Sequence, residues 1–180
     1  MITLFGKKKI SIDHLVNYTI HFVFDIVDNH FEDIKELLKI SPEFTQQPPV
    51  ETMQADMLYL ILFAAHMELM EQNLPAPYHQ TGPKNLCEKL GEIYNVPAEQ
   101  MEKMLKDELG FIKQINLPSK NLLYGLTKAF FNRYQLYKFQ EEYFKNLQVP
   151  NPILLKRLDE IFALFLINYE ELLNNYRLKQ

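Results

Sequence analysis

The residues best suited to metal or acid–base chemistry occur in one short stretch, HLVNYTIHFVFD, at residues 14–25. His14, His21 and Asp25 are seven and four residues apart, a spacing that places all three on one face of an α-helix. Imidazole and carboxylate groups bind zinc and transfer protons, so a metal site is one hypothesis. A structural metal ion needs three or four ligands, which would have to converge here from several helices.

The polar face that carries these residues extends further along the helix than a compact metal site would need. At 100° per residue, Tyr18 and Asp28 fall within about 40° of His14, and most other positions are apolar. Such a stripe is typical of the solvent-exposed side of a packed helix, so we expect no metal site and no catalytic residue. A site completed by a partner chain or another helix is the alternative. His30 lies about 160° from the stripe, so it is either buried or follows a break near residues 28–30.

Two further polar residues interrupt apolar helix faces. His66 shares its face with Tyr59, and a buried imidazole needs a hydrogen-bond partner, such as a tyrosine or carboxylate of another helix. Arg133 lies among aromatic residues and, because it keeps its charge, should find a carboxylate or extend to solvent. The alternative to these structural roles is a small-molecule pocket whose polar anchors are His66, Arg133, Tyr59, Tyr137 and Gln140.

Aromatic residues are abundant, with 13 Phe and 10 Tyr in 180 residues. Phe139 points away from the apolar face of its predicted helix, and Ile167 lies off the main apolar face of the next. Apolar side chains outside the core favour a protein–protein interface. We therefore expect a surface around Phe139 and Ile167 that binds another protein or a second copy of the chain.

Composition excludes several classes of protein. Lys and Arg number 19 against 23 Asp and Glu, and the resulting net charge of −4 argues against a nucleic-acid-binding protein. Cys87 is the only cysteine, so it forms no internal disulfide and is expected to be a small core residue. No nucleophile lies near a histidine in the sequence, and no phosphate-binding or cofactor motif occurs.

Targeting and membrane segments are also not expected. In MITLFGKKKISIDHL the lysines follow the apolar residues, the reverse of a secretory signal. The longest apolar run, residues 57–65, is much shorter than the roughly 20 residues that a membrane-spanning helix needs. We expect a soluble cytoplasmic protein without a membrane span.

Proline-containing loops separate long periodic segments, which predicts an all-α protein. Ser11 and Asn151 are expected helix N-caps. The helices are predicted at about residues 12–39, 52–73, 84–95, 97–115, 119–147 and 152–178. Four long antiparallel helices would form a bundle with a shorter helical hairpin inserted in the middle. This bundle would be one domain over residues 1–180, with residues 1–10 as a flexible N-terminal segment.

Three functions fit this architecture. The first is a non-enzymatic interaction or scaffold module that forms a homodimer or binds another protein. The second is a small-molecule-binding bundle with a pocket around His66 and Arg133. An enzyme that uses a histidine or a metal ranks last, and no cofactor is expected.

Overall fold

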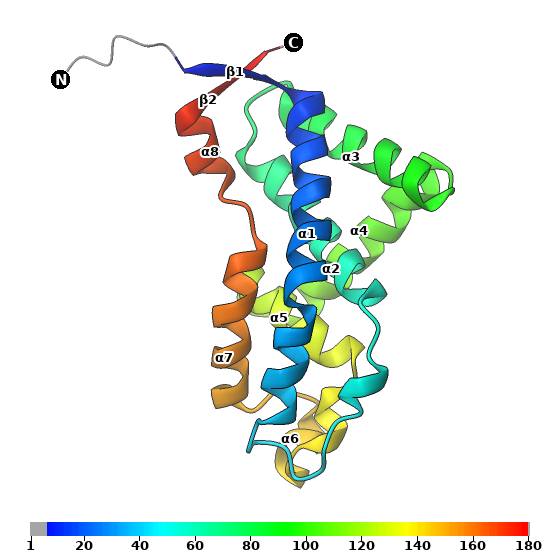
Figure 1. Cartoon of the computed structure of the whole chain (residues 1–180), viewed down its shortest axis with the longest axis vertical. Helices are drawn as coiled ribbons and strands as arrows, with labels where there is room; N and C mark the ends of the chain where they lie inside the picture. Colours follow the sequence, from blue (N-terminus) through cyan, green and yellow to red (C-terminus); the bar gives the residue numbers. More distant parts are fainter. Residues whose placement is uncertain (1–6, 180) are drawn as a thin grey trace, which may run out of the picture.

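The computed structural model describes residues 7–179 as an all-α bundle, which confirms the predicted fold class (Figure 1). The α-helices are α1 (Ile12–Lys39), α2 (Asp56–Asn73), α3 (Tyr78–Tyr94), α4 (Ala98–Ile115), α5 (Leu122–Arg133), α6 (Glu142–Leu147), α7 (Pro152–Phe162) and α8 (Tyr169–Asn175). Short 3-10 helices are η1 (Val50–Thr52), η2 (Leu136–Phe139) and η3 (Ala163–Phe165), and the strands are β1 (Lys8–Ser11) and β2 (Tyr176–Lys179).

Helix α1 runs along most of the length of the molecule (Figure 1). The Ser11 side chain accepts a hydrogen bond from the His14 backbone N–H at 3.1 Å, so the predicted N-cap is confirmed. The helix continues through residues 28–30 without a break. His30 is half-buried there, and its Nδ1 lies 2.8 Å from Asp33 Oδ2.

Helix α2 is the centre of the core. Every side chain from Ile61 to Glu68 is buried, because α1, α3, α4 and α5 all pack around this helix. This placement explains the long apolar run in the sequence. A helix that is apolar on nearly all sides is stable only when it is enclosed by neighbours.

Helices α3 and α4 form the predicted hairpin, which projects to one side of the bundle (Figure 1). Helix α3 begins at Tyr78 and not at the predicted Lys84, so residues 78–83 of the expected loop are helical. Gly82 and Pro83 are buried in this early turn. A Cβ at Gly82 would lie 2.9 Å from Leu74 Cδ1, so the missing side chain lets this turn pack closely against the end of α2.

The predicted helix over residues 119–147 is interrupted. Helix α5 ends at Arg133, and Gln135 adopts a left-handed conformation with φ of 54° before η2 and α6 follow. The Phe139 carbonyl accepts hydrogen bonds from Thr45 N at 2.8 Å and Gln46 N at 3.2 Å. The loop after α1 therefore uses a backbone acceptor that a continuous helix would have used itself.

The predicted helix over residues 152–178 is interrupted as well. Asn151 caps α7 as expected and accepts a hydrogen bond from Ile153 N at 2.8 Å. The chain leaves the helix after η3, and α8 starts with a new cap, in which the Asn168 side chain accepts from Glu171 N at 3.0 Å. Ile167 consequently lies outside any helix and is buried, with 8 % exposure.

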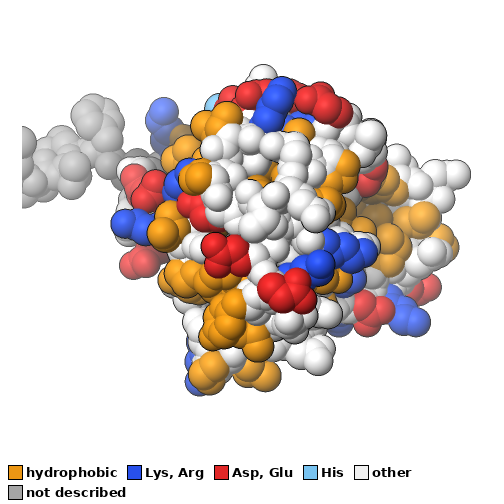
Figure 2. All heavy atoms as spheres, turned by 90° about the horizontal axis from the view of Figure 1, so that it is seen from below, with side chains coloured by type: hydrophobic (Ala, Val, Ile, Leu, Met, Phe, Trp, Pro, Cys, Tyr) orange, Lys and Arg blue, Asp and Glu red, His pale blue; other side chains and the backbone are white. Residues whose placement is uncertain are grey.

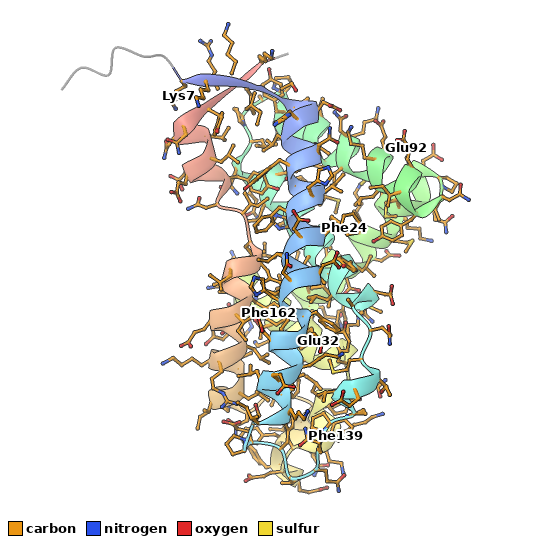
Figure 3. All side chains as sticks on the ribbon, in the orientation of Figure 1. Lys7, Phe24, Glu32, Glu92, Phe139 and Phe162 are labelled. Atoms are coloured by element: carbon orange, nitrogen blue, oxygen red, sulfur yellow. The ribbon has the colours of Figure 1, made fainter. Side chains whose placement is uncertain are left out.

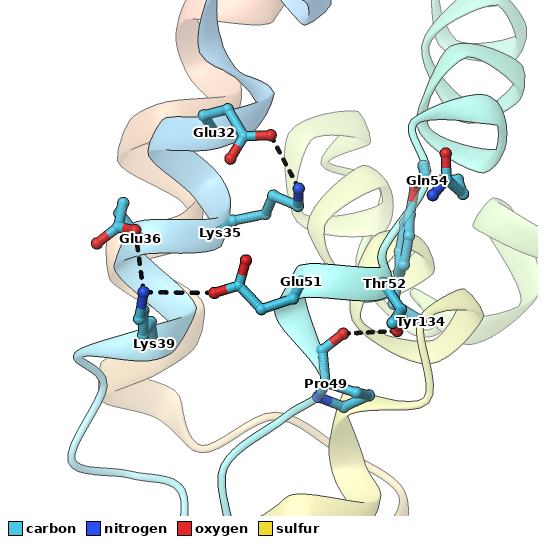
Figure 4. Close-up of polar contacts among 9 residues, drawn as sticks. All are labelled: Glu32, Lys35, Glu36, Lys39, Pro49, Glu51, Thr52, Gln54 and Tyr134. Atoms are coloured by element: carbon cyan, nitrogen blue, oxygen red, sulfur yellow. Dashed lines mark hydrogen bonds and ion pairs between the residues drawn. The ribbon is translucent and has the colours of Figure 1, made fainter.

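The loop between α1 and α2 is fixed to both of its neighbours. Lys39 Nζ lies 3.6 Å from Glu36 Oε1 and 3.4 Å from Glu51 Oε1, which joins the end of α1 to η1 (Figure 4). The Tyr134 hydroxyl donates to the Gln54 carbonyl oxygen at 2.6 Å and holds the loop against α5.

The two ends of the described chain meet in a parallel two-stranded sheet. Lys8 pairs with Tyr176 and Ser11 with Lys179, at the end of the bundle opposite α6 (Figure 1). The expected flexible segment over residues 1–10 is therefore a strand from Lys8 onward, whereas residues 1–6 lie outside the described residues. Within residues 7–179, no helix is both long and apolar enough to cross a membrane.

Candidate functional site

The polar stripe on α1 faces solvent, as its pattern predicts. His14, His21 and Asp25 are exposed, and Tyr18 retains 45 % exposure. Across residues 7–179, no three His, Cys, Asp or Glu side chains lie close enough together to hold a metal ion. Because its residues are exposed, the stripe forms the solvent-facing side of a packed helix.

His66 is completely buried and hydrogen-bonded at both ring nitrogens. Its Nε2 lies 3.1 Å from the Phe165 carbonyl oxygen, which can only accept, so this nitrogen carries the proton. Its Nδ1 then accepts from the Tyr169 hydroxyl at 3.3 Å, and that hydroxyl lies 2.9 Å from Thr19 Oγ1. Burial lowers the pKa of His66 to about 4, so the imidazole is neutral at pH 7.

This network gives His66 the hydrogen-bond partners that its burial requires, and one of them is a tyrosine, as expected. A ligand-binding role for His66 stays a prediction. The network connects α2 to the Phe165 backbone, to α8 and to α1. Burial also raises the pKa of the Tyr169 hydroxyl. The network acts as an internal tie between segments that are distant in sequence, and its polar atoms are already paired.

Arg133 finds the carboxylate that its charge requires. Its Nη2 lies 2.6 Å from Glu108 Oε2 and its Nε 3.2 Å from Glu108 Oε1, a two-point pairing with a carboxylate that is 3 % exposed. The guanidinium carbon lies 3.9 Å from the centre of the Phe111 ring. Two residues of α4 therefore contact the Arg133 guanidinium: Glu108 at its N–H edge and Phe111 at one of its faces.

The other three predicted pocket residues also have partners within the protein or pack against its core. The Tyr59 hydroxyl donates to Asp28, and burial together with this bond raises the pKa of Tyr59. Gln140 is 2 % exposed and bonds Val149 O at 2.9 Å and Asn151 N at 2.7 Å. Tyr137 is half-buried against the core. A ligand-binding role for these residues stays a prediction.

One cavity of about 410 Å³ lies between α2, the end of α4 and the start of α5, and we refer to it as the α2–α4–α5 cavity. Its polar lining residues are Glu68, Gln72, Lys113, Asn116, Ser119 and Lys120. A Cβ at Gly125 would lie 2.8 Å from Ile112 Cγ2 and 3.3 Å from Asn116 Cβ. The missing side chain therefore lets α5 approach α4 closely at two residues that line the cavity, Ile112 and Asn116.

Sequence reasoning did not single out these lining residues. Glu68 and Gln72, four residues apart within an apolar segment, are the only local signal. Glu68 Oε2 receives the Lys113 ammonium at 2.8 Å from a position 45 residues later, and such a contact is not visible in a single sequence.

A second cavity, of about 290 Å³, contains the only cysteine. Met67, His79, Cys87, Glu102 and Lys106 are among its lining residues. Burial, and next the Glu102 carboxylate, raises the pKa of the Cys87 thiol to about 11. The thiol therefore stays protonated at neutral pH and is a poor nucleophile.

Apolar side chains are exposed at the end of the molecule where α1 and α6 end and α7 begins. We call this group the apolar end, and it consists of Ile40, Tyr143, Leu147, Val149 and Ile153, with exposed fractions of 41–70 %. Figure 2 shows hydrophobic side chains on this face. Phe139, one of the two predicted interface residues, is half-buried at the same end of the molecule (Figure 3). Ile167 is buried elsewhere, and the interface roles of both residues stay predictions.

Comparisons of the chain with models of known families, with curated proteins and with solved structures found no match.

Proposed function

We propose that this protein is an interaction module that associates with a second copy of itself through the apolar end. The observation that supports the proposal is α6, a six-residue helix in which no side chain is buried. Helices this short are unstable in isolation and depend on a packed face. Tyr143 and Leu147, with exposures of 68 % and 55 %, offer such a face to a partner.

The composition of the apolar end suits the centre of a dimer interface. Its five side chains keep 41–70 % exposure. Interface centres are enriched in apolar and aromatic side chains and depleted of charged ones. A standard interface covers about 800 Å² per partner, so the apolar end would supply its centre and the neighbouring polar residues its rim.

The charges around the apolar end favour a second copy over a strongly charged partner. Lys138, Glu141, Glu142 and Lys145 lie in or next to α6 and carry two charges of each sign. In a two-fold arrangement the same surface meets itself, so lysines of one copy can face glutamates of the other. A surface with only one sign of charge would repel its copy.

Sedimentation equilibrium over a range of protein concentrations tests this proposal. We expect a reversible dimer in the unmodified protein, and Leu147→Asp should weaken it by about tenfold or more, because a buried charge replaces an apolar contact. Ile93→Asp is the matched control, since Ile93 is 51 % exposed on α3, away from the apolar end.

The dimer should therefore survive in the Ile93→Asp variant. A protein that stays monomeric at all concentrations would contradict the proposal. Equal dissociation by both substitutions would contradict the assignment of the interface to the apolar end. Circular dichroism of each variant shows that the helices remain folded.

A further inference from the structure

The α2–α4–α5 cavity has the size and lining of a binding site. Its volume of about 410 Å³ falls within the usual 300–1,000 Å³ of small-molecule pockets. One part of its lining is apolar and is formed by Ile112, Leu117 and Leu122. An apolar wall with a few polar groups is the usual composition of such pockets.

Hydrogen bonds hold the buried carboxylate at this cavity in place. Glu68 is 8 % exposed and accepts hydrogen bonds from Gln72 Nε2 at 2.6 Å and Lys113 Nζ at 2.8 Å. Both of its oxygens are therefore engaged, and the Lys113 ammonium is held at the cavity. Lys120 lines the same cavity, and it makes no ion pair within residues 7–179.

Asn116 is a buried polar residue in the lining of the cavity. It is 4 % exposed, and its Nδ2 donates to the Asn121 carbonyl at 2.7 Å, which fixes the orientation of the amide. Among the described residues, its buried Oδ1 has no hydrogen-bond donor. The amide of Asn116 is therefore fixed in the wall of the cavity, and its Oδ1 is an acceptor that a carboxylate head group, which carries only acceptors, does not pair with.

The charges of the cavity select the kind of ligand. The lining carries two ammonium groups, on Lys113 and Lys120, and one carboxylate, on Glu68, which is ion-paired with Lys113, so the lining has one net positive charge. We infer that the α2–α4–α5 cavity binds a small amphiphilic anion. Its carboxylate or phosphate head would lie at the two lysines, and its apolar body would lie along Ile112, Leu117 and Leu122.

The sequence offers a direct way to observe binding, because it contains no tryptophan. Leu117 is 71 % exposed at the cavity, so Leu117→Trp should introduce a single fluorescent reporter without disturbing the core. Ile93→Trp, on the exposed part of α3, is the matched reporter away from the cavity. Decanoate and decyl phosphate are the probes, with decyltrimethylammonium as a cation of similar length and acetate as a head group without a body.

We expect both decyl anions to shift the Leu117→Trp emission to shorter wavelength in a saturable way and to leave Ile93→Trp unchanged. Lys113→Met combined with Lys120→Met should weaken decanoate binding by about tenfold or more, since each lost charge-assisted contact is worth about 1.5 kcal/mol or more. Lys106→Met, also on α4 but at the cavity that contains Cys87, should leave the affinity unchanged.

Three results would overturn the inference. These are a cation that binds as tightly as the anions, an equal response from both reporters, and no effect of the double lysine substitution. Isothermal titration calorimetry of decanoate with the unmodified protein is an additional measurement that needs no reporter, and absence of binding there would also contradict the site. Acetate should not bind at comparable concentration, because it lacks the apolar body.

Discussion

His66 shows at the scale of one residue how a titratable group becomes part of a core. Its proton lies on Nε2, and its other nitrogen accepts from Tyr169, so the neutral form is the one that the surroundings fit. A protonated ring would lose the Tyr169 donor and carry a charge without exposure. The residue is therefore structural at neutral pH and destabilising in acid.

The pH dependence of stability should reveal that protonation of His66 destabilises the folded protein. Burial lowers the folded pKa of His66 from 6.5 to about 4, so below pH 6.5 the unfolded state takes up the proton first. The free energy of unfolding should thus fall by about 2 kcal/mol between pH 7 and pH 5 through this group alone. Urea denaturation of the unmodified protein and of His66→Gln at both pH values measures the difference.

His66→Gln should be less stable at pH 7 and lose less stability on acidification. His21→Gln, which changes an exposed histidine, should keep the pH dependence of the unmodified protein. Equal pH dependence in the His66→Gln variant and the unmodified protein would refute the role of burial.

Single residues were predictable where chemistry demands a partner. A buried histidine requires a hydrogen bond and a packed arginine requires a carboxylate, and the structure supplies Tyr169 and Glu108. The identities of these partners were not predictable, because they lie 103 and 25 residues away. For the same reason the sequence did not indicate the cavity next to Glu68.

At the scale of elements, two of the four helix starts with side-chain caps were predicted, whereas the caps of α5 and α8 and two of the breaks were not. Ser11 and Asn151 are local signals, and both cap helices as expected. The break after Arg133 contains neither glycine nor proline, and contacts with the loop at Thr45 stabilise it. The break before α8 has a local signal in Asn168 and Glu171, which is hidden within an otherwise helical pattern.

The left-handed conformation of Gln135 leads to a testable prediction about the break after α5. Gln135 has φ of 54°, which costs a residue with a side chain about 1 kcal/mol and glycine almost nothing. Gln135→Gly should therefore raise the free energy of unfolding by about 0.5 kcal/mol after the added entropy of the unfolded chain is subtracted. The midpoint of urea denaturation measures this change.

The control for this prediction is Gln114→Gly, which replaces an exposed glutamine within α4. There the same substitution should cost about 1 kcal/mol, because the backbone is helical. A loss of stability at both positions would show that the left-handed conformation at Gln135 is not the preferred one.

At the scale of the whole molecule, the parallel pairing of β1 and β2 joins segments at the two ends of the described chain. Each strand has four residues, too few for an alternating pattern to indicate a strand in the sequence. Leu178 is half-buried and packs against the core, whereas Arg177 beside it is exposed. The sheet thus depends on tertiary contacts.

Disruption of β2 should therefore loosen β1. We expect Leu178→Asp to speed the hydrogen exchange of backbone amides at residues 8–11, although the substitution lies at the opposite end of the chain. Arg177→Asp, on the exposed side of the same strand, should leave that exchange nearly unchanged. Hydrogen exchange followed by mass spectrometry measures the protection of residues 8–11 in both variants. Equal protection in the two variants would contradict the dependence of β1 on the packing of Leu178.

The direction of this strand pairing determines how the protein responds to tension. Because β1 and β2 are parallel, pulling on residues 7 and 179 loads opposite ends of the pair. The strands are then sheared along their length, so their hydrogen bonds resist together and do not open one after another. The hydrogen bonds of the small sheet would therefore have to break before the pulling force reaches the helices.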